Sequence, residues 1–288
     1  MMRSVLRFFW RGLYCFLRMT MTRPTIIMAA PNGARKVKTD HPAVPVTIAE
    51  TIATAKECHA AGASILHAHV RDDDGKHLLD AGRYGQLLDG LRQEVPEMLV
   101  QITTEAVGIY TPEQQADLVF ALKPDFVSVG FREMIGDNGE AARALAKQFY
   151  HQSLTEQINV QHILYDLDDL QRFRVAMADG ILPAARPHLL LVLGRYSGNF
   201  QSDPAEMKPF INDGLTDMAS WSICAFGHRE FDVMTDAIAS GGHCRVGFEN
   251  NLYLKDGSLA PNNAALIRQL AETCQPATRE ETLALFAL

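Results

Sequence analysis

Short apolar segments alternate eight times with longer helical segments from Pro24 onward, and this alternation predicts an α/β fold. These segments are nearly continuous apolar runs, which is typical of parallel strands in a sheet that helices cover on both faces. Eight such strands favour a closed barrel over an open doubly wound sheet, and the turn Pro31-Asn32-Gly33 does not match the GxGxxG turn of open folds. A chain of 288 residues is a common length for one barrel. We therefore predict a single-domain (β/α)8 TIM barrel over residues 23–288.

Each expected strand is short, largely apolar and bounded by glycine, proline or polar residues. In chain order the strands are Thr25–Ala30, Ser64–Val70, Leu99–Thr104, Phe126–Gly130, Val160–Tyr165, His188–Leu193, Trp221–Phe226 and Cys244–Glu249.

The expected helices between these strands have recognisable ends. Thr47 is a suitable N-cap for the first helix, and Pro112 stands at the first helical position of the third. Gly62 and Gly180 stand where two helices should end. The helices are Ile48–Ala61, Ala81–Val95, Pro112–Leu122, Gly139–Gln157, Leu167–Asp179, Pro204–Met218, Glu230–Ser240 and Asn262–Cys274. We expect Gln275–Leu288 to form one more short helix and an oligomer contact.

Residues 1–22 form a basic, aromatic segment before the first strand. Arginines interrupt its apolar runs, so it fits neither a signal peptide nor a membrane span. Two interpretations stay open. The start codon was assigned too early, since Met19 and Met21 lie just before the first strand, or the segment is a weakly amphipathic helix that binds a surface. On either interpretation we expect a poorly ordered extension.

Composition narrows the class of partner. The formal net charge of −7 argues against a general nucleic-acid-binding protein, whereas local arginine clusters still permit anionic small molecules. The five cysteines have no CxxC spacing, which predicts reduced thiols in a cytoplasmic protein. We expect no nucleic-acid partner and no membrane partner.

Two histidines at the end of the second predicted strand suggest a metal site. His67 and His69 are two residues apart, so their side chains point to the same side of the strand and can bind one metal ion. The alternative is a pair of buried histidines with structural partners. The last strand and the second strand both flank the first when the barrel closes, so Glu249 can approach both histidines. The alternative for Glu249 is a salt bridge to Arg245.

A ligand set of two histidines and one carboxylate suits catalytic Zn²⁺, which acts as a Lewis acid. The same set resembles the facial triad of non-haem iron enzymes. The ligand types alone therefore leave the metal open.

Further polar residues stand at the strand ends, where barrels place their active sites. Arg71 and Arg245 can hold carboxylates through paired hydrogen bonds. Thr103 and Ser128 can donate hydrogen bonds to a substrate carboxylate, although small hydroxyl residues inside barrels often serve packing alone.

A glycine-bearing, basic loop follows the sixth predicted strand. With the loop Gly227-His228-Arg229 after the seventh strand, it predicts a phosphate-binding edge for a cofactor. The residues that we assign to this edge are Gly194, Arg195 and Gly198.

Three stretches, in order and in spacing, carry a family resemblance. They are Ala60-Ala61-Gly62-Ala63 leading to His67-Ala68-His69-Val70-Arg71, then Gln101-Ile102-Thr103-Thr104, and then Gly241-Gly242-His243-Cys244-Arg245-Val246-Gly247-Phe248-Glu249. The chain resembles the β-keto acid cleavage enzyme family, typified by 3-keto-5-aminohexanoate cleavage enzyme, over nearly its whole length from about residue 24.

The resemblance implies a zinc-binding (β/α)8 barrel that forms a homo-oligomer, often a tetramer. It implies that acetyl-CoA and a β-keto acid are converted to acetoacetate and a new acyl-CoA. By resemblance the site residues are His67, His69 and Glu249 as zinc ligands, Thr103 and Ser128 as contacts of the keto acid, and Arg245 in the catalytic machinery.

Two departures from the family pattern bear on mechanism and substrate. Asn250 stands where the typical enzyme has an aspartate, thought to be the general base, and an amide cannot take up a proton at neutral pH. Glu105 is a candidate base, because the typical enzyme has glycine there. Arg35 stands where the typical enzyme has an acidic residue that binds the amino group of the substrate. We therefore expect an anionic or polar neutral keto acid rather than an amine.

Two other functions stay open at this point. One is a metal-dependent aldolase or hydrolase that uses the same site without CoA. The other is a metabolite-binding barrel that lost catalysis when the base at position 250 became an asparagine.

Overall fold

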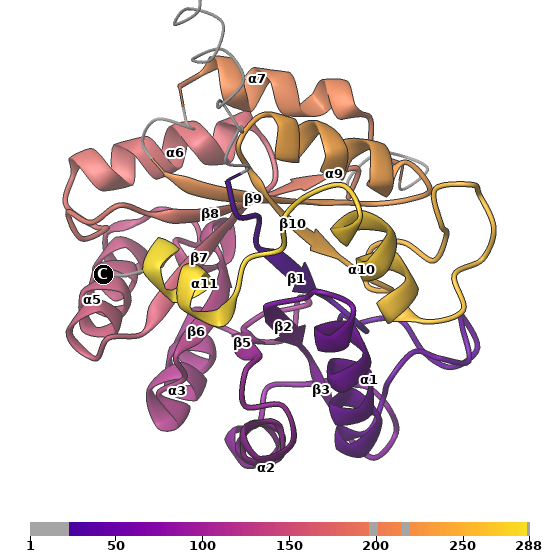
Figure 1. Ribbon diagram of the computed structural model, residues 1–288. Coiled ribbons are helices and arrows are strands. Elements are labelled where there is room, and N and C mark those ends of the chain that lie inside the picture. The colour runs from indigo at the N-terminus through magenta and orange to yellow at the C-terminus, as the bar shows by residue number, and fades with distance from the viewer. Residues whose placement is uncertain (1–22, 196–200, 215–218, 287–288) are drawn as a thin grey trace, which may run out of the picture.

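The structure is a computed structural model that describes residues 23–195, 201–214 and 219–286. Its strands form a closed, parallel, eight-stranded barrel in the order β1-β10-β9-β8-β7-β6-β5-β2 (Figure 1). These strands are β1 (Ile27–Ala29), β2 (Ile65–Ala68), β5 (Leu99–Thr103), β6 (Phe126–Gly130), β7 (Asn159–Leu164), β8 (His188–Leu193), β9 (Ser220–Ala225) and β10 (His243–Val246). The predicted barrel is confirmed. The expected extension over residues 1–22 lies outside the described residues.

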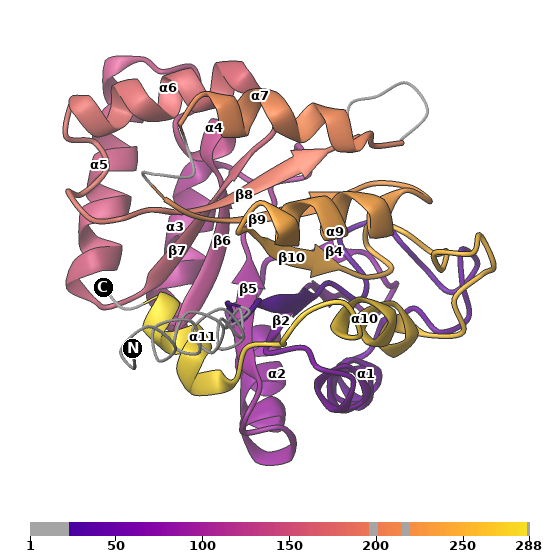
Figure 2. The same ribbon diagram turned by 45° about the horizontal axis from the view of Figure 1, so that its top comes forward.

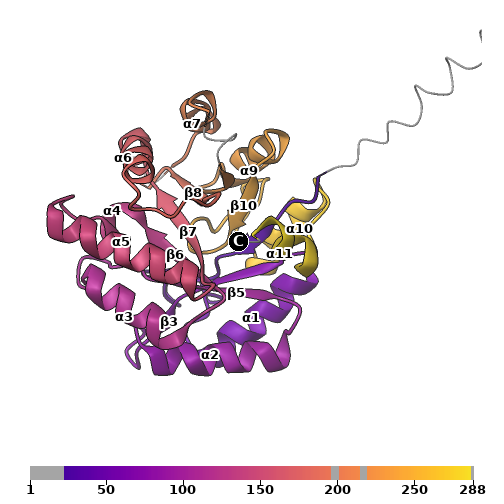
Figure 3. The same cartoon turned by 90° about the vertical axis from the view of Figure 1, so that its left-hand side faces the viewer.

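Helices surround the barrel, as Figure 3 shows from another side. They are α1 (Ile48–Ala60), α2 (Ala81–Glu94), α3 (Pro112–Leu122), α5 (Glu140–Thr155), α6 (Leu167–Ala178), α7 (Met207–Asn212), α9 (Glu230–Ala239), α10 (Asn263–Ala271) and α11 (Arg279–Leu285). Thr47 and Thr111 begin α1 and α3 with complete capping boxes, which explains why these starts are visible in the sequence. Within the described ranges no helix is both long enough and apolar enough to cross a membrane.

The structure adds elements that are too short for a periodic pattern to predict. β3 (Val70–Arg71) and β4 (His77–Leu78) form an antiparallel hairpin directly after β2. A four-residue helix, α4 (Phe131–Met134), follows β6. The prediction of a single helix over Pro204–Met218 is wrong for the residues that the structure describes. A 3₁₀ turn over Pro204–Glu206 leads into α7, which ends at Asn212, and residues 215–218 lie outside the described ranges.

Side chains inside the barrel change from apolar to polar along its axis. At the N-terminal ends of the strands an apolar cluster fills the interior, formed by Ile26, Met28, Ile65, Leu99 and Phe126 together with Phe286 at the end of α11. The ring of Phe286 lies edge-on to that of Phe126, with ring centroids 5.2 Å apart. The next layer holds the buried polar residues Gln101, Gln161 and Ser222, which are joined by hydrogen bonds. Helix α11 therefore closes the barrel at the N-terminal ends of its strands. Toward the C-terminal ends, polar side chains line the interior.

The last predicted strand, Cys244–Glu249, is too long, because β10 ends at Val246 and the chain then turns. Gly247 has φ +148°, and a Cβ there would lie 2.3 Å from the carbonyl oxygen of Ala30 at the end of β1. Only glycine allows this close approach. The turn brings the backbone N–H of Glu249 to the same Ala30 oxygen, at 3.1 Å, and so places Glu249 over the end of β1.

The Gly247→Ala variant tests this close approach. We expect its free energy of unfolding to fall by about 3 kcal/mol or more, since the added methyl meets backbone that cannot move aside. Gly257→Ala is the matched control, because Gly257 also has a positive φ (+83°) but has nothing within 4 Å of its added Cβ. That variant should lose only about 1 kcal/mol. Equal losses in urea unfolding would contradict the steric argument.

Candidate metal centre

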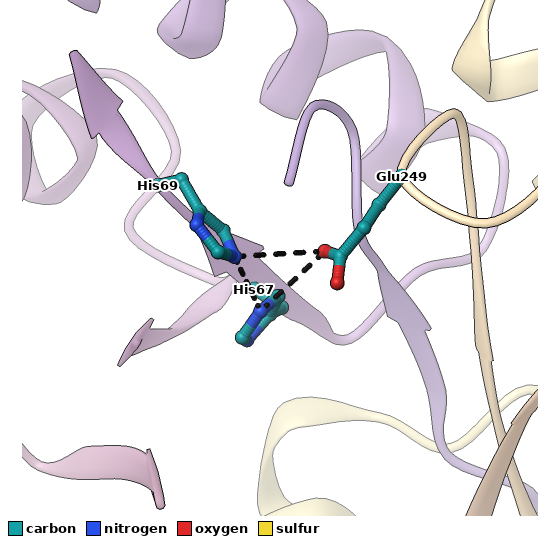
Figure 4. Close-up of side chains that lie close together, drawn as sticks. All are labelled: His67, His69 and Glu249. Carbon is teal, nitrogen blue, oxygen red and sulfur yellow. Dashed lines mark hydrogen bonds and ion pairs between the residues drawn. The ribbon is translucent and has the colours of Figure 1, made fainter. Parts of the chain in front are cut away.

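Three side chains converge above the C-terminal ends of the strands, as Figure 4 shows. His67 belongs to β2, His69 follows it, and Glu249 reaches across from the turn after β10. The two Nε2 atoms lie 3.1 Å apart, and Glu249 Oε2 lies 3.5 Å from His67 Nε2 and 3.7 Å from His69 Nε2. The predicted ligand set is thus assembled at the predicted end of the barrel.

A hydrogen bond at Nδ1 of His67 leaves the other ring nitrogen, Nε2, free to bind a cation. Its Nδ1 lies 2.8 Å from Gln101 Oε1, and Gln101 Nε2 donates to Gln161 Oε1 at 3.1 Å. The Gln101 oxygen is therefore the acceptor, so His67 carries its proton on Nδ1 and directs the lone pair of Nε2 toward the centre.

Burial keeps both histidines neutral. It lowers the pKa of His67 well below its usual value, and the nearby Arg245 guanidinium lowers it further. Burial likewise lowers the pKa of His69, with the neighbouring His67 adding to the effect. Neutral imidazole is the form that binds metals.

The donor set fits a divalent cation. Two neutral imidazoles bring their Nε2 atoms together, and Glu249 Oε2 is buried without a hydrogen-bond partner in the described part of the chain. Such a cluster of acceptors is repulsive unless a cation or a proton lies among them. The three residues can hold a metal as two nitrogens and one oxygen, with further positions open to a ligand.

Arg245 orients the carboxylate. Its guanidinium donates to Glu249 Oε1 at 3.0 Å and to Cys224 Sγ at 3.3 Å. The salt bridge that was the alternative interpretation of Glu249 therefore exists, but it occupies only Oε1 and leaves Oε2 facing the histidines. Burial raises the pKa of Cys224 to about 11, so the thiol remains protonated.

A cavity of about 440 Å³ opens beside the centre. Its walls include the loop after β1 and the loop after β10, which pack through Val44 and Phe248 and lie side by side in Figures 1 and 2. Six further predicted site residues line it: Arg35, Thr103, Glu105, Arg195, Arg245 and Asn250.

Glu105 and Asn250 both face this cavity. Burial raises the pKa of Glu105, and the nearby Glu249 carboxylate raises it further. Glu105 Oε1 lies 3.7 Å from an Arg195 nitrogen, and its backbone N–H donates to Thr103 Oγ1 at 3.0 Å. Asn250 is 5% exposed, and neither its amide oxygen nor its amide nitrogen has a hydrogen-bond partner within the described residues. Both of these side chains are available to a bound molecule.

The structure gives Arg71 other partners than a substrate. It is not among the residues that line the cavity, and its guanidinium donates to backbone carbonyls of the loop after β1, including those of Ala34 at 2.6 Å and Lys36 at 3.1 Å. It also donates to Gly75 in the β3–β4 turn at 3.3 Å. Arg71 therefore holds together two loops, one of which carries Arg35.

Three other predicted residues do not line the cavity or cannot be placed. Ser128 is buried beside Thr103 in the barrel wall, and its hydroxyl has no hydrogen-bond partner in the described ranges. Gly194 has φ +75° and lies against the backbone of Ser202. Gly198 lies outside the described residues.

One neighbour of the centre was missed in the sequence. His77 of β4 is buried, and its Nδ1 lies 3.4 Å from Nδ1 of His69. The only signal for it was a third histidine eight residues after His69, which has no meaning until the hairpin is known.

Comparison with known proteins identifies the family. The sequence model of the beta-keto acid cleavage enzymes matches residues 24–283. A 3-oxoadipate:acetyl-CoA acetyltransferase of Cupriavidus necator is 28% identical over 264 residues, which cover 88% of this chain and 90% of that protein. A 3-keto-5-aminohexanoate cleavage enzyme of Acetoanaerobium sticklandii is 29% identical over 257 residues, with coverages of 85% and 89%.

Among solved structures, the apo structure of ObcA superposes with a TM-score of 0.66 at 14% sequence identity. The match covers 86% of this chain and 66% of that one, and at this identity it shows a shared barrel fold alone. The family model matches nearly all of the described barrel, and both sequence relatives align with this chain over most of their own length. This chain therefore belongs to the β-keto acid cleavage enzyme family.

Proposed function

We propose that this protein is a zinc-dependent transferase that condenses a β-keto acid with acetyl-CoA and releases acetoacetate and a new acyl-CoA. The observation that carries the proposal is the His67–His69–Glu249 cluster in the wall of a cavity that also holds Arg245 and Glu105. The relatives named for acetyl-CoA transfer and for keto acid cleavage support the same reaction class.

His67, His69 and Glu249 would hold the metal. A divalent ion held there would supply Lewis acidity, which would make the carbon between the keto group and the carboxylate of the substrate more acidic. The guanidinium of Arg245 is buried beside this position and stabilises negative charge that develops on substrate oxygens.

Glu105 is the residue that we propose as general base. It faces the cavity, and its carboxylate Oε2 lies 4.0 Å from Nδ1 of His69, beside the metal ligands. Glu105 takes the proton from the carbon between the two carbonyl groups, and that carbon then attacks the thioester of acetyl-CoA. The thiolate of CoA adds to the original keto carbon, and cleavage of the carbon–carbon bond releases acetoacetate and the new acyl-CoA. The proton held by Glu105 returns to acetoacetate.

The mouth of the cavity favours an anionic keto acid. Arg35, Lys36 and Arg195 all line it, and Arg35 is exposed at the surface. A second carboxylate on the substrate would form ion pairs with these side chains, whereas their positive charge would repel an amine. We therefore propose a dicarboxylic β-keto acid of the β-ketoadipate type, with the phosphates of CoA held along the Gly194–Arg195 edge.

We also propose that the enzyme is a cytoplasmic homotetramer. The four described cysteines, Cys58, Cys224, Cys244 and Cys274, are all free thiols, which supports a reducing compartment.

Metal analysis tests the centre directly. Purified wild-type protein should contain a stoichiometric amount of zinc, and removal by a chelator should abolish acetoacetate formation from a β-keto acid and acetyl-CoA. Loss of a hydrogen-bond partner of a ligand weakens metal binding by up to about 100-fold. His67→Ala removes a ligand itself, so it should weaken zinc binding by more than that. His162→Phe is the control, since His162 is also buried but packs against Phe173 of α6. Full zinc content in His67→Ala would contradict the ligand assignment.

The role of Glu105 as general base is tested by exchanging carboxylate and amide side chains at positions 105 and 250. Glu105→Gln should lower kcat by about 10²- to 10⁴-fold, because it removes the proton acceptor, with zinc content unchanged. The double variant Glu105→Gln with Asn250→Asp should recover part of that loss, since it places a carboxylate at the other position that faces the cavity. Wild-type turnover by Glu105→Gln would exclude Glu105 as the base.

Charge reversal at the cavity mouth tests the substrate class. Wild-type protein should prefer β-ketoadipate to 3-keto-5-aminohexanoate in kcat/KM, and Arg35→Glu should lower the value for β-ketoadipate by about tenfold. Lys38→Glu is the matched control, because Lys38 is in the same loop but pairs with Glu50, away from the cavity. Comparable turnover of the two substrates by the wild-type protein would refute the argument from Arg35.

A further inference from the structure

A third histidine connects the metal centre to the loop that carries Glu105. His77 lies in β4 and is 8% exposed. Its Nδ1 is 3.4 Å from Nδ1 of His69, and its Nε2 is 2.8 Å from the backbone oxygen of Glu105. The ring thus bridges a metal ligand and the backbone of the proposed base.

The chemistry of the partners determines where the protons lie. A carbonyl oxygen can only accept, so His77 carries its proton on Nε2 and donates it to Glu105. In a neutral ring, Nδ1 of His77 is then an acceptor, so a hydrogen bond between the two rings needs the proton of His69 on its Nδ1. His69 is left with a bare Nε2, which is the atom that faces His67 and Glu249.

The β3–β4 hairpin is held in place from the same side. The backbone N–H of Leu79 donates to the hydroxyl of Tyr110 at 3.2 Å, and the Tyr110 ring stands edge-on to His77 with centroids 6.1 Å apart. Tyr110 belongs to the same connection between β5 and α3 as Glu105. The hairpin and that connection therefore hold each other through His77 and Tyr110.

We propose that His77 is a positioning residue that sets the tautomer of His69 for metal binding and ties it to the backbone of Glu105. The proposal rests on the proposed function, because it takes His69 as a metal ligand. It assigns the hairpin a role that the stretch His67-Ala68-His69-Val70-Arg71 does not indicate, since His77 lies beyond that stretch.

Three variants separate hydrogen bonding from packing. His77→Phe keeps a ring of similar size but can neither accept from His69 nor donate to Glu105. His77→Gln keeps one acceptor and one donor on a shorter planar group. His162→Phe removes a buried histidine on the helix-facing side of β7 and controls for a general loss of stability.

The first measurement is zinc affinity by competition with a chromogenic chelator. We expect His77→Phe to bind zinc about 10- to 100-fold more weakly than wild type, the range for an outer hydrogen-bond partner. His77→Gln should recover most of the affinity, and His162→Phe should match wild type. Unchanged affinity in His77→Phe, with binding lost in His67→Ala, would overturn the role of His77 and leave the metal site standing. A wild-type protein that binds no zinc would overturn both.

The second measurement needs no variant. Long-range proton–nitrogen correlation spectra of zinc-loaded protein labelled with ¹⁵N-histidine report the tautomer of each ring. His69 should carry its proton on Nδ1 and His77 on Nε2. A His69 ring protonated on Nε2 would overturn the proposal even if His77→Phe does not fold.

Discussion

The site depends on how β1 closes the barrel. β1 pairs in parallel with β2 on one side and with β10 on the other, so that Met28 is level with Ile65 and with Arg245. This double pairing brings the second and last strands to either side of one short strand. The two histidines at the end of β2 and the glutamate that follows β10 can then meet over the end of β1. Gly33 gives Glu249 the room to do so, since a Cβ there would lie 2.4 Å from its Cγ.

The two ends of the barrel interior perform different tasks. The cluster around Phe286 buries mainly apolar side chains, although the ring of His188 also packs against Phe286, whereas the other end gathers several buried polar groups around one cavity that lack hydrogen-bond partners in the described residues. These groups include Glu249 Oε2, Arg245 Nε and both amide atoms of Asn250. Unpaired buried polar atoms destabilise a fold, so their accumulation around one cavity indicates a surface made to receive a polar ligand.

Sequence periodicity predicted the barrel and its order of elements because each long strand or helix buries many residues in a regular pattern. The convergence of the three candidate ligands was also predictable, since strand spacing and barrel closure suffice to bring His67, His69 and Glu249 together. The β3–β4 hairpin was not, because two-residue strands have no period, and His77 was missed with it. Nor does the sequence distinguish an arginine that meets a substrate from one such as Arg71, whose partners are backbone carbonyls supplied only by the folded loops.

The closure of the apolar end by α11 bears on how the chain folds during its synthesis. Ile26 and Met28 enter the ring of apolar side chains first, but their cover, Phe286, is translated after all the strands. A nascent chain therefore exposes this ring until α11 has left the ribosome. Recognition by chaperones should concentrate there, at the end of the barrel farthest from the chemistry.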